Sequence, residues 1–141
     1  MDFTILGDPH LGRIFVHGVP LRRRGEREVM MWRDFAQSLS SVAAPLHICM
    51  GDLFDRAVVS YDTIVSAARL YVHAAAKFTE TKFIILRGNH DTSRDADKVS
   101  AFDVFSMIVG RVENIRTVSE PQNIDGYWFF PWDPVCSAAD L

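Results

Sequence analysis

The stretch FTILGDPHLG, residues 3–12, opens the chain with a short apolar run that ends at a glycine and is followed by an aspartate and a histidine. A similar order occurs twice further along the chain, as LHICMGDLFD at 46–55 and KFIILRGNHD at 82–91. Short apolar runs that end at glycine-containing turns are typical of buried strands. The fold is therefore expected to be organised around three strands, each followed by a polar loop.

Helical spacing of apolar residues separates these strands. It predicts helices over residues 26–43, 61–79 and 98–109. Further strands are expected at 114–118 and 127–130. Alternating strands and helices indicate an α/β fold with a largely parallel sheet, right-handed crossovers and flanking helices. The continuous apolar runs predict that both faces of the strands are covered.

The composition is that of an ordinary globular domain. The 141 residues are 48% hydrophobic and 23% charged, with a net charge of −3, which excludes a strongly basic protein. The N-terminus lacks the basic start of a secretion signal, and no apolar stretch is long enough to span a bilayer. Cys49 and Cys136 form no CxxC motif and are expected to be free thiols in a reducing compartment. These features predict a cytoplasmic protein that does not bind membranes.

Arginines are concentrated near the first loop. Six of them fall between residues 13 and 33: Arg13, Arg22, Arg23, Arg24, Arg27 and Arg33. Such a run forms either a solvated surface or a patch that contacts phosphates, and both alternatives stay open here.

Side chains that bind metal ions follow each of the three strands. Asp8 and His10 follow the first strand, Asp52 follows the second, and Asn89 follows the third. Parallel strands end at one edge of a sheet, so these loops should lie side by side. Side chains two residues apart in an extended segment point the same way, which predicts that Asp8 and His10 bind one ion. Asp52 is then able to bridge to a second ion, to which Asn89 offers its amide oxygen.

Two further residues complete a site for phosphoryl transfer. Two ions roughly 3.5–4 Å apart polarise a phosphoryl group and activate a water molecule. His90, next to Asn89, is placed either to donate a proton to the leaving oxygen or to steady the phosphate. Asp55, three residues after Asp52, is expected to orient His90 through a hydrogen bond. Each motif is weak by itself, but three in this order favour a metal site.

The motifs D-x-H, G-D-x-x-D and G-N-H-D together resemble those of the calcineurin-like metallophosphoesterases. The longer forms DPHLGR, GDLFDR and RGNHD resemble the SbcD branch, which comprises nuclease subunits of double-strand-break repair and recombination complexes. FFPW, at residues 129–132, is similar to an element of that branch. The resemblance runs from residue 1 to about residue 134. It implies a DNA nuclease that uses two divalent metal ions, usually Mn²⁺, and works with an SbcC-type ATPase. It assigns metal binding to Asp8, His10, Asp52 and Asn89, and catalysis to His90 held by Asp55.

The family pattern is incomplete over this sequence. The family usually supplies a further histidine and a later G-H-x-H motif, and neither is found here. None of His17, His47 and His73 is expected to replace them, because His47 opens a strand at the far edge of the sheet and His73 lies opposite the apolar face of its helix. Residues 1–141 are therefore interpreted as one nuclease domain truncated at its C-terminus. The second ion, held by Asp52 and Asn89 alone, is expected to bind weakly, and turnover is expected to be poor or absent.

Two alternatives remain at this stage. One keeps the metal site but makes the chain a phosphatase or a cyclic phosphodiesterase of the same superfamily. The other makes it an inactive assembly module that forms a homodimer through aromatic residues near its end, unless these pack in the core. Those residues are Trp128, Phe129, Phe130 and Trp132.

Overall fold

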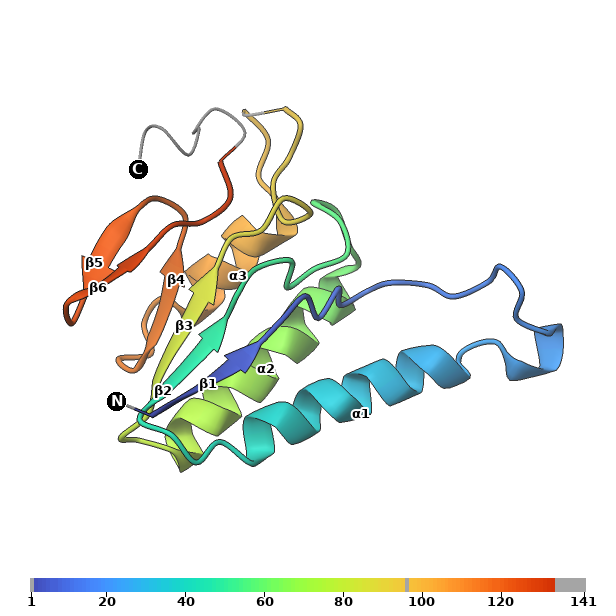
Figure 1. Ribbon diagram of the computed structural model, residues 1–141. Helices are drawn as coiled ribbons and strands as arrows, with labels where there is room; N and C mark the ends of the chain where they lie inside the picture. The colour runs from blue at the N-terminus through green and yellow to red at the C-terminus, as the bar shows by residue number, and fades with distance from the viewer. Residues whose placement is uncertain (1, 96, 134–141) are drawn as a thin grey trace.

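Four parallel strands form the main sheet of the computed structural model, which describes residues 2–95 and 97–133. They are β1 (Phe3–Leu6), β2 (Leu46–Cys49), β3 (Lys82–Leu86) and β4 (Ile115–Val118). Their spatial order is the order of the chain, β1-β2-β3-β4, and every pairing is parallel (Figure 1). The predicted α/β fold with a parallel sheet is confirmed.

The crossover helices are α1 (Glu26–Ser40), α2 (Tyr61–Lys77) and α3 (Ala101–Val109), and a short 3₁₀ turn, η1 (Leu21–Arg23), precedes α1. Three helix boundaries differ from the predicted ones, and the smallest difference is that α2 ends two residues early. The hydroxyls of Ser40 and Ser41 both donate to the Gln37 carbonyl, and such bonds compete with helical ones and end α1 early. Ser100 forms a capping box with Asp103, which starts α3 three residues later than expected. None of the helices in the described part of the chain combines the length and apolarity needed to cross a bilayer.

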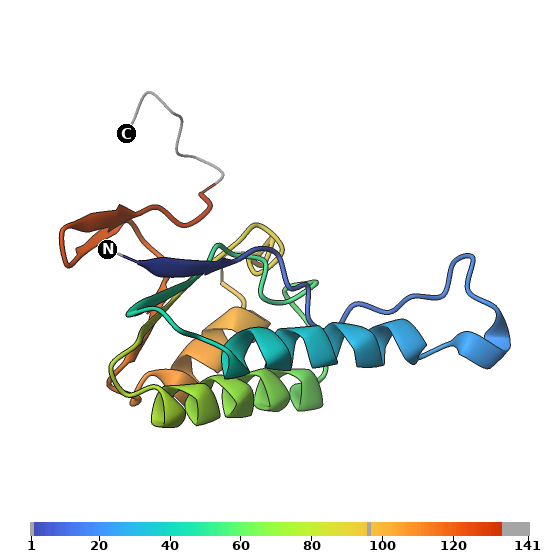
Figure 2. The same ribbon diagram turned by 60° about the horizontal axis from the view of Figure 1, so that its bottom comes forward.

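All three helices lie on one face of the sheet (Figure 2). Right-handed crossovers place every helix on the same side when successive strands are added in one direction. The core between helices and sheet is rich in aromatic rings, and the ring of Tyr71 contacts those of Phe35, Phe83 and Phe105 edge-on. Cys49 is a free, buried thiol in this core. Cys136 lies outside the described residues.

The opposite face of the sheet is covered only in part. A hairpin of β5 (Gln122–Ile124) and β6 (Tyr127–Phe129) packs Phe129 against a small cluster on this face, made of Leu46, Ile84, Leu86 and Val118. On β1, in contrast, Phe3 and Ile5 are 54% and 58% exposed. The prediction that the strands are covered on both faces is wrong for β1, because all the helices are on the other side.

The aromatic residues after β5 divide between core and surface. Phe129 is buried, whereas Trp128, Phe130 and Trp132 are exposed. The rings of Trp128 and Phe130 stack on each other. The two alternatives for this segment were packing in the core and exposure at the surface. Phe129 packs in the core, whereas Trp128, Phe130 and Trp132 lie at the surface.

Candidate metal centre

The first two loops are joined through their backbones at the carboxyl edge of the sheet. His10 N donates to the Asp52 carbonyl at 2.9 Å, Leu11 N to that of Leu53 at 2.8 Å, and Asp55 N to that of Leu11 at 2.9 Å. Leu11 and Leu53 are fully buried, as is Phe54. The apolar residues between the polar ones thus anchor both loops in the core, which leaves His10, Asp52 and Asp55 facing a common space.

Asp91 holds the third loop against the second. Its carboxylate is fully buried and accepts hydrogen bonds from Gly88 N at 2.8 Å, Phe54 N at 2.9 Å and Leu53 N at 3.2 Å. Burial raises the pKa of Asp91 to about 6 although these bonds oppose the shift, and the charge of nearby Asp52 raises it further. Sequence reasoning assigned no role to Asp91, although it ends the G-N-H-D motif.

Glycine is required where the second and third loops meet. A Cβ atom on Gly88 would lie 2.1 Å from Oδ1 of Asp52, a distance that no side chain tolerates. Gly51 has a φ of 121°, and a Cβ atom on it would lie 3.0 Å from Cα of Gly88. These two residues allow the backbone of the third loop to approach the carboxylate of Asp52 directly.

Three side chains with metal-binding atoms converge at this edge. Ligand atoms of His10, Asp52 and His90 all lie within 4.8 Å of one another. Nε2 of His10 is 3.8 Å from Oδ2 of Asp52, and His90 N donates to Oδ1 of Asp52 at 2.9 Å. Imidazole nitrogens and a carboxylate form a ligand set that suits Mn²⁺, Fe²⁺ or Zn²⁺. We call these three residues the metal cluster.

Asn89 adds an oxygen to the metal cluster. Its amide oxygen faces Oδ2 and Oδ1 of Asp52 at 3.1 and 3.2 Å. Acceptor oxygens this close repel each other unless a cation or a proton lies between them. Turning the amide over places its NH₂ group there instead, as a donor to both carboxylate oxygens. Asn89 and Asp52 could therefore hold a divalent cation together when the amide oxygen faces the carboxylate. When the amide is turned, the two side chains hydrogen-bond to each other and need no cation.

The backbone of the site is left-handed at three of the predicted ligands. Asp8, His10 and Asp52 have φ angles of 40°, 46° and 48°. Such conformations cost roughly 1–3 kcal/mol each for residues other than glycine and are concentrated at functional sites. The expectation that Asp8 and His10 lie on an extended segment is wrong, since a positive φ turns the chain at both residues. Asp8 is exposed and outside the metal cluster, so its role as a ligand stays a prediction.

Asp55 contacts both histidines, but in different ways. Nδ1 of His90 is 2.7 Å from the backbone carbonyl of Asp55, whereas the Asp55 carboxylate lies 3.5 Å from Nδ1 of His10. A carbonyl only accepts, so Nδ1 of His90 must carry the hydrogen, and its Nε2 has no hydrogen-bond partner among the described residues. The predicted link between Asp55 and His90 therefore runs through the backbone, while the carboxylate is placed to orient His10.

His47 and His73 lie apart from the metal cluster. His47 is 2% exposed within β2, its Nδ1 is 2.8 Å from Oγ1 of Thr4, and burial lowers its pKa to about 4. His73 is exposed on α2, as its helical position predicted. Both placements agree with the expectation that neither residue replaces a missing ligand.

Residues 1–135 match the family of calcineurin-like phosphoesterases. The chain belongs to this family. The metal cluster supplies side chains that could hold a divalent ion. Among solved structures, the nuclease MPE of Pseudomonas putida has a TM-score of 0.46 and 19% sequence identity, over 86% of this chain and 49% of that chain. The chain thus spans about half the length of that nuclease. No curated protein matches it.

Proposed function

We propose that the chain is the catalytic part of a metal-dependent DNA nuclease of the SbcD type, which hydrolyses phosphodiester bonds. The observation that carries the proposal is the convergence of His10, Asp52 and His90 at the carboxyl edge of the sheet, in a member of a phosphoesterase family. The sequence forms DPHLGR, GDLFDR and RGNHD support the SbcD branch within that family.

The donor set indicates which residues hold the metal ions. Asp8, His10 and Asp52 would bind the first ion, and Asp52 and Asn89 the second. Mn²⁺ suits this mixture of carboxylate, imidazole and amide ligands. When bound, such ions polarise the phosphoryl group and lower the pKa of a water molecule. The second ion has fewer protein ligands, so we expect it to bind more weakly.

His90 is the residue that we expect to supply a proton to the leaving oxygen. The Asp55 carbonyl holds the ring of His90 through Nδ1, which leaves Nε2 to carry and release a proton. His90 is exposed, so substrate is able to reach it. This arrangement fits a general acid that protonates the leaving alkoxide.

The arginine-rich segment supports DNA as the substrate. Residues 12–25 extend away from the sheet towards the start of α1 (Figure 1). Arg23 pairs with Glu26, and the guanidinium groups of Arg13 and Arg27 lie over the ring of Phe15. Arg22 and Arg24, which flank Arg23 in the sequence, are exposed as well. Such a segment is suited to contact phosphates without reading base sequence.

The proposal extends to the partners. By the same resemblance, we propose an SbcC-type ATPase as the partner subunit. The exposed Phe3 and Ile5 on the open face of the sheet suit association, and a homodimer is one way to cover them.

The test compares substrates and matched histidine variants. Any turnover that the protein shows with Mn²⁺ should be of plasmid DNA and bis(p-nitrophenyl) phosphate, with p-nitrophenyl phosphate left nearly untouched. His90→Asn should abolish cleavage, whereas His73→Asn, which changes another exposed histidine, should not. Preferential hydrolysis of the monoester would instead make the chain a phosphatase. Diester cleavage that survives Asp52→Ala would exclude the proposed site.

A further inference from the structure

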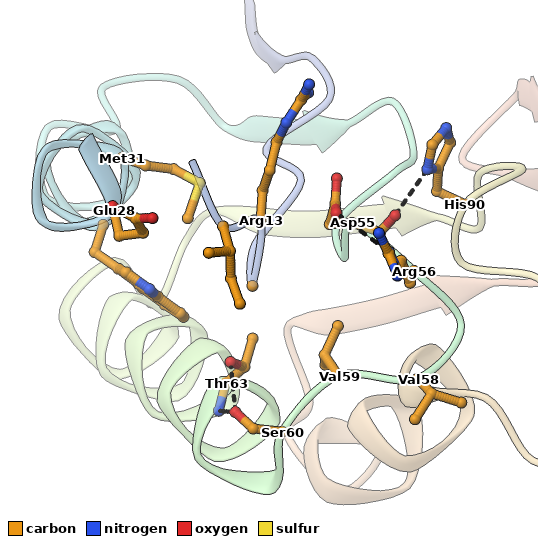
Figure 3. A pocket seen from close by; sticks show the side chains of 13 residues that line it. Arg13, Glu28, Met31, Asp55, Arg56, Val58, Val59, Ser60, Thr63 and His90 are labelled. Carbon is orange, nitrogen blue, oxygen red and sulfur yellow. Dashed lines mark hydrogen bonds and ion pairs between the residues drawn. The ribbon is translucent and has the colours of Figure 1, made fainter. Parts of the chain in front are cut away.

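A cavity of about 800 Å³ lies directly beside the metal cluster. Its walls come from the first loop, from α1, from the start of α2 and from the segment after β2 (Figure 3). Asp55 and His90 line one side of it. A phosphate bound at the metal cluster would therefore place one of its substituents at the mouth of this cavity.

The wall opposite His90 is apolar and carries an aromatic ring. Met31 and Trp32 of α1 line this part, and Val59 lies across from them. The ring of Trp32 contacts Phe35 edge-on, with centroids 6.1 Å apart, and Phe35 is buried in the core. Trp32 is therefore positioned by the core while it stays half-buried at the cavity. Flat, fixed aromatic rings of this kind bind nucleobases by stacking.

The cavity is lined by two acids and two arginines, and only one of these arginines pairs with an acid in the described part of the chain. Glu28 accepts a hydrogen bond from Phe15 N at 2.7 Å, and the carboxylate of Asp55 is shared between His10 and Arg56. The guanidinium of Arg13 lies over a neutral ring, so its charge is uncompensated there. The side chain of Arg56 is 83% exposed. Asp55 thus pairs with Arg56, whereas Arg13 forms no ion pair with an acid among the described residues, so Arg13 is the arginine of the lining that is placed to attract a phosphate.

Hydroxyl groups complete the lining. Ser60 and Thr63, at the start of α2, lie in the floor of the cavity, with their oxygens 2.9 Å apart. They offer short hydrogen-bonding groups to a sugar or a base edge. Aromatic, apolar, hydroxyl and cationic groups therefore all meet in one space beside the metal cluster.

We infer that this cavity binds the nucleoside adjoining the scissile phosphate, with the base against Trp32. The inference deepens the proposed nuclease function and rests on it. A phosphopeptide, which lacks a planar base, would leave the wall of Trp32 unused.

Binding in EDTA separates this inference from metal chemistry. Thymidine 5′-monophosphate should quench tryptophan fluorescence saturably and should bind at least about tenfold more tightly than deoxyribose 5-phosphate, as one base–aromatic stack predicts. Trp32→Ala should remove this preference, and Trp32→Phe should retain most of it. Trp128→Ala, which changes an exposed tryptophan of β6, should have no effect. Ile14→Glu, at a 74% exposed position of the lining, should weaken nucleotide binding without threatening the fold.

The outcomes distinguish the two proposals. Equal affinity for the two phosphates, nucleotide binding that survives both Trp32→Ala and Ile14→Glu, or tighter binding of a phosphotyrosine peptide would overturn the nucleoside site. Hydrolysis of bis(p-nitrophenyl) phosphate, which carries no nucleoside, tests the nuclease function separately. Loss of that hydrolysis with retained thymidylate binding would overturn the catalytic proposal and leave the cavity assignment in place.

Discussion

Polar side chains at the two ends of the parallel sheet differ in their exposure and in their hydrogen-bond partners, and two asparagines illustrate the contrast. At the amino end, Asn114 donates through Nδ2 to the carbonyls of Thr81, Ala75 and Phe78 at 3.0, 3.1 and 3.2 Å. At the carboxyl end, the amide of Asn89 lies against the carboxylate of Asp52, and its NH₂ group, once turned towards the carboxylate, donates to Oδ2 and Oδ1 at 3.1 and 3.2 Å. The first asparagine is fully used by the fold. The second is exposed and contacts a candidate metal ligand.

The same contrast holds for the histidines and for the backbone. His47 at the amino end is buried, and its pKa is lowered by that burial. His10 and His90 lie at the carboxyl end, where their rings form a T-shaped contact with centroids 4.8 Å apart. Left-handed φ angles occur at Asp8, His10 and Asp52 in the loops at the carboxyl end, and also at Asp125 in the turn between β5 and β6. The predicted ligands thus lie on strained backbone, whereas His47 lies within a regular strand.

Asp52→Ala should have the largest effect and should separate the two ends most sharply. The carboxylate belongs to the metal cluster and also accepts from His90 N, so its loss should abolish diester hydrolysis and weaken Mn²⁺ binding. Calorimetric titration with Mn²⁺ and a nuclease assay measure both. Asn114→Ala is the control at the other end, and it should bind Mn²⁺ as the wild type does. Unchanged Mn²⁺ affinity in Asp52→Ala would remove the basis for the comparison.

His47 should make the amino end sensitive to acid. Its pKa is about 4 in the folded protein against 6.5 when unperturbed, so the unfolded chain binds the proton more readily. The contribution of neutral His47 to the free energy of unfolding is fully present above pH 6.5. It is lost as the pH falls towards 4, and this loss amounts to about 3 kcal/mol. Urea unfolding at several pH values measures the loss, and His47→Gln should flatten this part of the profile. A profile unaffected by His47→Gln would show that the histidine is not responsible.

Asn114→Ala should lower the free energy of unfolding by about 2 kcal/mol, because three carbonyl groups lose a shared donor. Urea denaturation at neutral pH measures this change. The matched variant Asn89→Ala removes the same side chain at the other end and should leave stability nearly unchanged while weakening Mn²⁺ binding. Comparable destabilisation by both variants would contradict the division of roles.

Asp55→Asn should have the smallest effect, about a tenfold loss of Mn²⁺ affinity, since a carboxylate that orients a metal-binding histidine typically contributes about this much. The backbone carbonyl that holds His90 is unaffected by the substitution. Calorimetry with Mn²⁺ is the measurement, and unfolding experiments should show little change. If Asp55→Asn instead leaves the Mn²⁺ affinity as it was, the carboxylate does not orient His10.

Much of the fold follows from local patterns. The strands at 3–6 and 82–86 were predicted with the observed bounds, and the helix at 61–79 ends within two residues of the prediction. The meeting of the three loops at one edge follows from parallel crossovers, whereas the order of the strands was not predicted. The roles of individual side chains were harder to predict, because they depend on contacts between distant segments. Val29 of α1, for example, is apolar and yet 59% exposed.

The sequence alone determined the α/β fold, the family and the loops that carry the candidate ligands, because periodicity and short motifs are local properties. Only the tertiary structure decided that all helices cover one face, that Asp91 ties two loops together and that Asp55 holds His90 through its backbone. It also placed Trp32 beside the metal cluster. These features depend on how segments up to 80 residues apart in the numbering of the chain pack against one another, and no spacing within a single segment encodes that packing.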